Sequence, residues 1–364
     1  MFAAVVLLAV LGGPTAAAAA PGHRLFTITD SRITEASGIA VGLASPGVVY
    51  VQNDSGDSSR FFALDARTGA TAATFAVPAA RNVDWEDIAV ARDAAGTPSV
   101  WLADIGDNDA ARSEVQVYRV DEPHVAASAR DGTLRSARPD VWRLRYPGGA
   151  VNAESFAVTP DGTGYLVTKS VIGASVVYRL PPRPDASRVQ TLQRVGAIQF
   201  VPDGTSNPFG IAGELSATAA SISRDGSVLV VRTYTAAYVW RLRGADVRAA
   251  IAQRATRVRL PEQRQGEGIA VDGPRLLVDS EGVGTAVYAV PVPRVPGSSA
   301  PSRSSTASSA SRPDRPGPGS APANARTPPV GGTSHLARWL IGTGAAAAVI
   351  VAIAVVRSRR RPSR

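Results

Sequence analysis

The sequence contains no cysteine, only three histidines and a single lysine, Lys169, among its 364 residues. Without cysteine there are no disulfides, so a secreted domain with this sequence must be stabilised by its own core. His23, His124 and His335 lie near the ends or in an insertion, which argues against a Ser-His-Asp triad, a Cys-His pair or a histidine zinc site. The sequence also lacks a P-loop and a dinucleotide-binding glycine pattern.

The net charge of +9 is unevenly distributed. Residues 1–295 hold 29 basic and 29 acidic residues, so the whole surplus lies in the last part of the chain. A neutral folded region gives no reason to expect a nucleic-acid-binding face.

The two ends of the chain predict targeting to the cell surface. The apolar run Phe2 to Leu11 and the small-residue tract Ala16 to Ala20 predict a signal peptide over residues 1–20, although no Lys or Arg precedes the run. The uncharged stretch Trp339 to Val356 predicts a transmembrane helix over residues 336–356. The arginine-rich tail 357–364 should stay in the cytoplasm. We therefore expect a single-pass protein of the cell membrane, with its N-terminal part outside.

Two regions remain between these ends. Residues 296–335 are rich in Ser, Pro and Ala and have too few large apolar residues to fold, so we expect a stalk. Residues 21–295 are long enough to form a core and constitute the predicted ectodomain.

The ectodomain repeats internally. A polar pair followed by a short apolar strand recurs five times, and in each repeat a second strand follows across a turn. The turns include Asp161-Gly162, Asp225-Gly226 and Asp272-Gly273. The five first strands begin near Glu35, Asp84, Asn152, Thr218 and Gln265. The second strands are Val48 to Gln52, Val100 to Ala103, Tyr165 to Thr168, Val228 to Arg232 and Leu276 to Asp279.

A third strand in each repeat carries an aromatic residue in register, and a less regular fourth strand follows in four repeats. The aromatic residues are Phe62, Tyr118, Tyr178, Trp240 and Tyr288. The fourth strands are expected at Ala73 to Val77, Val141 to Tyr146, Val189 to Val195 and Thr256 to Leu260. Four antiparallel strands per repeat predict an all-β fold, a β-propeller.

Five blades can be read from the repeats, and the longer spacings after Glu86 or Glu154 leave room for a sixth. The fifth repeat lacks a fourth strand, so we expect Leu25 to Thr29 to complete its blade and close the ring. The competing fold is a β-sandwich, which does not explain the repeated aromatic residues.

In such blades the start of the first strand and the end of the second lie on one face near the axis. The residues at these places are mostly acidic and should converge on one rim. The candidate ligand-binding residues are Glu35, Asp54, Asp84, Glu86, Asp104, Asp107, Glu154, Lys169, Arg232, Glu267 and Glu281.

Carboxylates placed this close repel one another. A divalent cation held by Glu86, Glu154 and Glu267 would offset the repulsion, and oxygen ligands of this kind suit Ca²⁺ or Mg²⁺, with Ca²⁺ the candidate. Neutralisation by Lys169 and Arg232, or protonation of one carboxyl group to give an acid/base pair, are the alternatives. A purely structural role, in which these residues bind neighbouring blades, also remains open.

Two Asp- and Gly-rich turns follow second strands, at Asn53 to Asp57 and Asp104 to Asp109. Such turns can wrap a cation, but Asp and Gly are also ordinary turn residues, and neither segment matches an EF-hand loop.

Four segments together resemble a family of actinobacterial secreted β-propellers, described as WD40-like or as relatives of the "esterase-like activity of phytase" propellers. They are Glu35 to Ala40, Asn53 to Gly56, Asp84 to Ala89 and Asp104 to Asn108. Related propellers of the phytase, gluconolactonase and paraoxonase types bind Ca²⁺ at the axis and hydrolyse phosphoesters, lactones or esters, so the resemblance implies a metal. The sequence lacks the dense Lys/Arg pocket of a phytase and the WD and GH signatures of WD40 repeats.

The resulting expectation is a membrane-anchored propeller that binds a cell-envelope protein or a small-molecule ligand outside the cell, with a divalent cation at its acidic rim. The alternative is a metal-dependent extracellular hydrolase of esters, lactones or phosphoesters. The sequence leaves open whether the protein is an enzyme.

Overall fold

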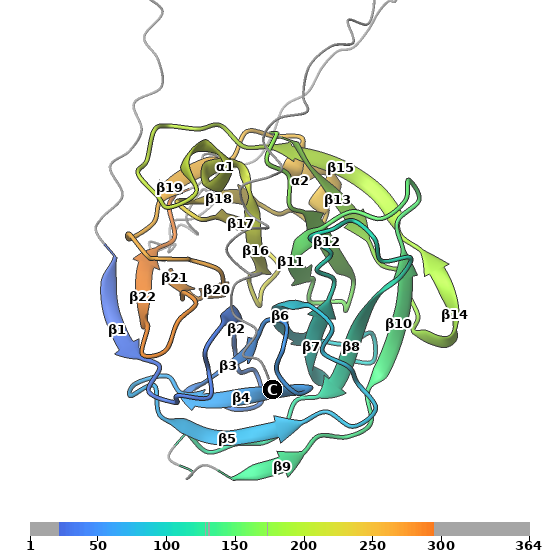
Figure 1. Ribbon diagram of the computed structural model, residues 1–364, viewed down its shortest axis with the longest axis vertical. Coiled ribbons are helices and arrows are strands. Elements are labelled where there is room, and N and C mark those ends of the chain that lie inside the picture. The colour runs from blue at the N-terminus through green and yellow to red at the C-terminus, as the bar shows by residue number, and fades with distance from the viewer. Residues whose placement is uncertain (1–21, 128, 130–131, 173, 295–364) are drawn as a thin grey trace, which may run out of the picture. The chain divides into compact units, whose positions relative to one another are not determined.

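The computed structural model of the chain describes residues 22–127, 129, 132–172 and 174–294 (Figure 1). The predicted signal peptide, stalk, transmembrane helix and basic tail lie outside these residues. None of the helices within the described ranges is long and apolar enough to cross a membrane.

Five β-sheets, each with four antiparallel strands, surround one axis and form a five-bladed β-propeller, which confirms the predicted fold (Figure 1). The described residues contain no sixth blade. Blade 1 contains β2 (Ala36–Val41), β3 (Val48–Asn53), β4 (Arg60–Asp65) and β5 (Thr71–Ala76). Blade 2 contains β6 (Trp85–Arg92), β7 (Pro98–Asp104), β8 (Val115–Asp121) and β10 (Asp140–Arg145). Blade 3 contains β11 (Ala153–Val158), β12 (Gly164–Thr168), β13 (Ala174–Arg179) and β15 (Gln193–Gln199).

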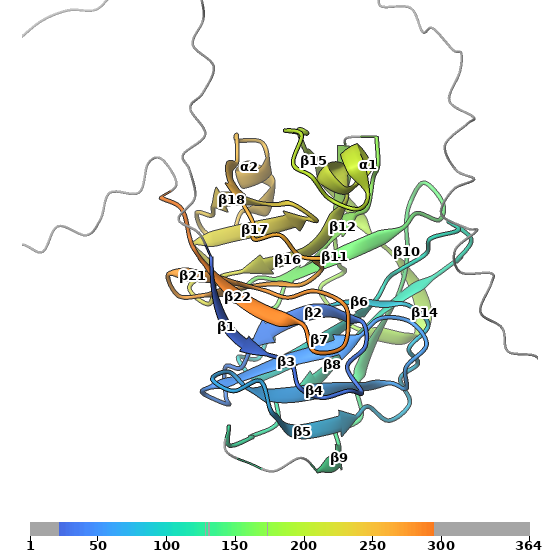
Figure 2. The ribbon, with the colours of Figure 1, turned by 60° about the vertical axis from the view of Figure 1, so that its left-hand side comes forward.

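Blade 4 contains β16 (Ala217–Ile222), β17 (Val228–Thr233), β18 (Ala236–Arg241) and β19 (Thr256–Arg259). Blade 5 contains β20 (Ile269–Asp272), β21 (Arg275–Val278), β22 (Ala286–Pro291) and β1 (His23–Thr27). The N-terminal strand β1 pairs antiparallel with β22, as Figure 2 shows, so the ring closes as the sequence predicts. The short helix α1 (Gly210–Leu215) lies in the connection from blade 3 to blade 4, and α2 (Val247–Ile251) lies between β18 and β19 of blade 4.

Two extra strands extend the outer edges of blades 1 and 2. The strand β9 (Thr133–Arg135) pairs parallel with β5, and β14 (Asp185–Thr191) pairs parallel with β10. The prediction of one fourth strand over Val189 to Val195 was therefore wrong. The chain instead leaves β14 in blade 2 and continues at once into β15 of blade 3. Leu192, between the two strands, donates its backbone N–H to the backbone oxygen of Arg145 in β10.

The core consists of five apolar layers, one between each pair of adjacent blades. Successive residues of a strand point to opposite faces of its blade, so each strand supplies two layers. In β3, Val48 and Tyr50 pack toward blade 2, while Val49 and Val51 pack toward blade 5. The aromatic residues of the third strands lie in these layers, which explains why they recur in register.

Candidate functional site

One local distortion recurs on the first strands at the rim. In blades 1 to 4 the pairing with the second strand shifts, so that one extra residue of the first strand is left unpaired. Such a bulge redirects the side chain of the extra residue. The residues at this bulge position are Ser37, Glu86, Glu154 and Thr218, and the matching residue of blade 5 in sequence is Glu267.

The bulge residues connect neighbouring blades. The Ser37 hydroxyl donates to the backbone oxygen of Glu86 at 2.6 Å, and the Thr218 hydroxyl donates to the backbone oxygen of Glu267 at 2.9 Å. The two small bulge residues therefore hold the next blade in place, while the three glutamates carry carboxylates at the axis. The bulge position therefore has a structural role in the blades that carry Ser37 and Thr218, and it supplies carboxylates to the candidate site in the other three. The sequence left these two roles as alternatives.

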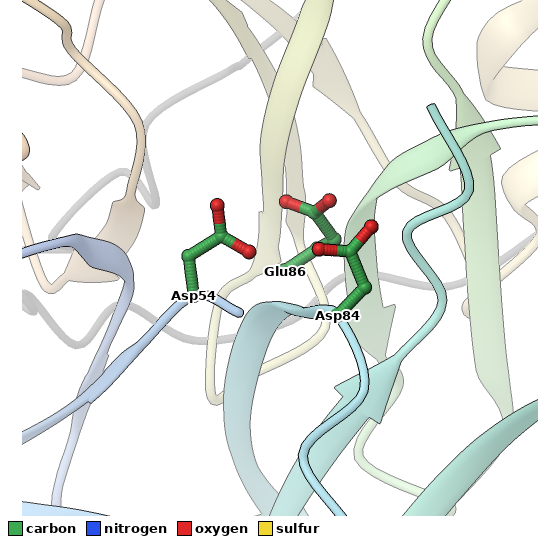
Figure 3. Close-up of side chains that lie close together, drawn as sticks. All are labelled: Asp54, Asp84 and Glu86. Carbon is green, nitrogen blue, oxygen red and sulfur yellow. The ribbon is translucent and has the colours of Figure 1, made fainter. Parts of the chain in front are cut away.

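Three carboxylates meet at the boundary between blades 1 and 2 (Figure 3). One oxygen from each of Asp54, Asp84 and Glu86 lies within 4.8 Å of the others, and we call this group the acidic triad. Asp54 follows β3, whereas Asp84 and Glu86 flank the start of β6. The three side chains come from two blades and point toward one another (Figure 3).

The backbone around the triad is fixed by hydrogen bonds. Asp54 donates its backbone N–H to the backbone oxygen of Glu35 at 2.9 Å. The side-chain amide of Asn82 donates to the backbone oxygen of Asp54 at 2.7 Å. Asp84 donates its N–H to the carboxylate of Asp104 at 3.0 Å. The triad is therefore held in position by the fold.

Gly106 packs directly against the carboxylates of Asp84 and Glu86 and leaves no room for a Cβ. Sequence reasoning missed this role of Gly106, which looks like an ordinary turn glycine in the Asp- and Gly-rich segment.

Burial and repulsion between neighbouring carboxylates make the carboxyl groups of Asp84 and Glu86 hard to ionise. Burial, together with the nearby Asp54, raises the pKa of Asp84 to about 7. Burial first, and then the charges of Glu154, Asp54 and Asp84, raise the pKa of Glu86 well above its usual range. A bound cation would favour the ionised forms of both groups and remove the repulsion.

A second, charge-balanced group adjoins the triad. Lys169 Nζ lies 2.5 Å from Glu154 Oε1 and 3.0 Å from the Tyr234 hydroxyl. Burial lowers the pKa of Lys169, but Glu154, Tyr234 and Glu267 together raise it well above its usual value, so the amine is protonated. The ring of Tyr234 contacts that of Phe209 at a centroid distance of 4.4 Å. Tyr234 and Phe209 are site residues that sequence reasoning missed, because neither belongs to a repeated motif.

Of the carboxylates predicted to share an ion, only Glu86 belongs to the triad. Glu154 is paired with Lys169, and Glu267 is a buried group whose pKa is raised well above its usual range by burial and by Glu154. The group that the described residues bring within common reach of an ion includes Asp54 and Asp84 instead.

The expectation that Arg232 acts at the rim needs correction. Its side chain is fully buried, and its guanidinium donates to the backbone oxygens of Gly268 at 2.6 Å and Asp279 at 3.0 Å and to the Gln263 side chain at 2.7 Å. Arg232 therefore ties blade 4 to blade 5 and is not available to a ligand.

The remaining predicted residues are buried or half-buried. Asp104 forms an ion pair with Arg112 at 2.9 Å, and Asp107 accepts the backbone N–H groups of Ala111 and Arg112, as expected of a turn-forming residue. Glu35 and Glu281 are half-buried. The Glu281 carboxylate contributes to the raised pKa of Glu267.

None of the protein-family models and none of the curated proteins compared matches the sequence. Three solved structures are similar in fold. The PQQ-bound aldose sugar dehydrogenase from Streptomyces coelicolor has a TM-score of 0.40 at 11% identity, over 74% of this chain and 97% of that one. A gluconolactonase from Xanthomonas campestris has a TM-score of 0.37 at 14% identity, over 70% and 71%. The Malassezia sympodialis allergen Mala s 1 has a TM-score of 0.44 at 10% identity, over 73% and 94%.

The likeness is one of fold. At these identities and TM-scores it carries no argument about chemistry, so function must be argued from the site itself. The resemblance to actinobacterial and phytase-like propellers remains a prediction from the sequence.

Proposed function

We propose that the protein is an extracellular, membrane-anchored ligand-binding propeller that holds a divalent cation at the acidic triad. The observation that carries this proposal is the meeting of Asp54, Asp84 and Glu86, whose oxygens lie within 4.8 Å of one another. Carboxylate oxygens are the ligands that Ca²⁺ prefers, and a divalent ion offsets the repulsion between them. Ca²⁺ is thus the proposed ion.

Exposed apolar side chains support a binding role for the same rim. Of the eight large apolar residues that the described part of the chain exposes, seven lie in loops that join blades or link second to third strands. They are Val83, Val171, Ile172, Val201, Phe209, Ile211 and Val283. These loops all emerge on the face where the triad lies. Exposed apolar side chains on the same face as a polar centre are typical of a surface that another molecule covers.

The loop that precedes α1 is ordered although it exposes Phe209. The Glu214 carboxylate accepts the N–H of Asp203 at 2.6 Å, and Asp203 forms an ion pair with Arg257 at 2.6 Å. The Phe209 ring packs on Tyr234 beside Lys169. A ligand bound at the triad would find this aromatic surface already formed, which lowers the entropy cost of binding.

The proposed location follows from the signal peptide, stalk and transmembrane helix predicted in the sequence. A stalked propeller anchored at the cell surface would present its rim to proteins or small molecules of the cell envelope. Expression of the full-length chain with one epitope inserted directly after Ala20 and another at the C-terminus, followed by protease treatment of intact cells, tests the topology. The N-terminal epitope should be lost and the C-terminal epitope protected.

A metal-dependent hydrolase is the second candidate, favoured by the Lys169–Tyr234 pair. An ammonium and a phenol beside a cation site are suitable donors for an oxygen that becomes negatively charged during ester or phosphoester cleavage. Turnover of nitrophenyl esters, lactones or phosphoesters that requires Ca²⁺ and is lost in Lys169→Met would support this candidate over a binding role alone.

Thermal unfolding of the purified full-length protein tests the cation. An ion that binds only the folded state at 100 times its Kd stabilises it by about 2.7 kcal/mol. For a domain of this size we expect the midpoint to rise by about 5–10 °C when Ca²⁺ replaces EDTA.

The variant Glu86→Gln should lose this rise in the midpoint. The control Glu262→Gln makes the same charge change at an exposed residue outside the triad and should keep it. A wild-type midpoint that is the same in EDTA and Ca²⁺ would contradict the proposal.

A further inference from the structure

Gln52, near the end of β3, is fully buried, and neither its amide oxygen nor its amide nitrogen has a hydrogen-bond partner among the described residues. A buried polar group left without a partner costs roughly 1–3 kcal/mol. Leu or Met would fill the same space without this penalty. The amide at this position therefore requires an explanation.

The packing of β3 shows which way Gln52 points. Val48 and Tyr50 belong to the apolar layer shared with blade 2, whereas Val49 and Val51 belong to the layer shared with blade 5. Since side chains alternate along a strand, Gln52 faces blade 2. The pairing continues through the hydrogen bond from Asp54 N to Glu35 O, so Asp54 faces the same way.

The part of blade 2 that approaches Gln52 is the start of β6. Gln52 pairs with Gly38, and a Cβ on Gly38 would lie only 2.7 Å from the backbone nitrogen of Ile88. Ser37, next to Gly38, donates its hydroxyl to the backbone oxygen of Glu86. The amide of Gln52 thus lies one layer beneath Asp54, on the face toward Glu86.

We propose that the side-chain oxygen of Gln52 is a neutral ligand of the cation held by the acidic triad. This inference rests on the proposed function and extends it to a fourth protein ligand. Ca²⁺ takes six to eight oxygens and commonly combines carboxylates with amide oxygens. An amide oxygen adds to the coordination without adding a fourth negative charge to a crowded, largely buried group, and the ion supplies the partner that this oxygen lacks.

Calorimetric titration of the full-length protein with Ca²⁺, alongside thermal unfolding in EDTA, tests this ligand. In Gln52→Leu the Kd for Ca²⁺ should rise about tenfold or more, by analogy with the effect of losing a supporting ligand contact. The midpoint in EDTA should stay the same or rise, because an unpaired amide has been removed.

The variant Gln52→Glu separates ligation from packing. It keeps an oxygen at this position, so Ca²⁺ binding should persist, while the added negative charge should lower the midpoint in EDTA. This variant also decides the matter if Gln52→Leu does not fold. Loss of Ca²⁺ binding in Gln52→Glu would overturn the inference.

The failures of the two proposals are distinguishable. If wild type binds Ca²⁺ and Gln52→Leu binds it equally well, Gln52 is not a ligand, and the cation site stands without it. If wild type binds no Ca²⁺, both proposals are overturned.

Discussion

Asp87 offers the most direct test of how the ring is held together at its axis. Its carboxylate accepts the backbone N–H groups of Phe156 in blade 3 at 2.8 Å and of Ala220 in blade 4 at 3.0 Å, besides that of Ile88 in its own strand. Gly38 of blade 1 packs against the same side chain. One buried side chain therefore links four of the five blades.

Two substitutions at Asp87 should differ in a predictable way. Burial raises the pKa of Asp87 well above its usual range, although the hydrogen bonds from the three backbone N–H groups lower it. Both Asp87→Asn and Asp87→Ala therefore replace a carboxyl group that strongly resists ionisation. Asparagine keeps the oxygen that accepts from Phe156 and Ala220, whereas alanine leaves both N–H groups buried and unpaired. At roughly 1–3 kcal/mol for each unpaired group, Asp87→Ala should be less stable than Asp87→Asn by about 2–6 kcal/mol.

Urea unfolding followed by tryptophan fluorescence measures this difference, because Trp85 and Trp101 are buried beside the first strands. Asp121→Ala, at an exposed residue at the end of β8, is the control and should change stability by less than about 0.5 kcal/mol. Free energies of unfolding for Asp87→Ala and Asp87→Asn that agree within about 1 kcal/mol would refute the reasoning, since the hydrogen bonds to other blades would then contribute little.

Three further predictions concern single groups near the axis. Because Lys169 is the only lysine, an amine-reactive ester modifies one side chain. The variant Glu154→Gln should speed this reaction at pH 8, because it removes the carboxylate that raises the pKa of Lys169. Mass spectrometry of the Lys169 peptide measures the rate, and an unchanged rate would contradict the pairing of Lys169 with Glu154. Burial raises the pKa of Asp279 to about 6, so the folded state keeps a proton that the unfolded chain releases near pH 4. Relative to Asp279→Asn, the free energy of unfolding should fall by about 2 kcal/mol between pH 4 and 6, and by about 3 kcal/mol in total from well below pH 4 to well above pH 6. A flat difference curve would be inconsistent with this. Gly106→Ala should abolish the Ca²⁺-dependent rise in midpoint because its Cβ would displace Asp84 and Glu86. The control Gly148→Ala, where a Cβ meets no other atom and φ is not positive, should keep that rise.

The repeat made the fold predictable, because each blade must meet the same packing requirement. Phe62 and Tyr118 recur in register since every third strand contributes to an apolar layer between blades. Ring closure could also be predicted, since an open fifth blade would expose an unpaired strand edge. The strands β9 and β14 could not, because they belong to insertions and pair parallel with the outermost strand of a blade.

The site could be predicted only in part. Topology alone brings the starts of first strands and the ends of second strands to one rim, so the convergence of Asp54 and Glu86 followed from the repeat. Which groups pair with which depends on side-chain distances that the sequence does not contain. Arg232 looked like a rim cation, yet it packs inward between blades and donates to backbone oxygens.

Gln52 illustrates a signal that was present in the sequence but hard to weigh. It is a polar residue at the end of the apolar run Val48 to Val51, where the strand could equally have emerged into solvent. Only the packing of β3 shows that the amide is buried and lies on the side of the strand toward blade 2.

The bulge position explains how one repeat can build both the ring and the site. A residue there is turned toward the axis by the backbone, whatever its type. Ser37 and Thr218 use this direction to donate to the bulge residue of the next blade, while Glu86, Glu154 and Glu267 use it to bring carboxylates to the centre. Blades that carry a small hydroxyl residue therefore secure the neighbouring blade that carries a glutamate. Replacing Ser37 by Ala should consequently weaken Ca²⁺ binding through the position of Glu86, even though Ser37 itself offers no ligand to the ion.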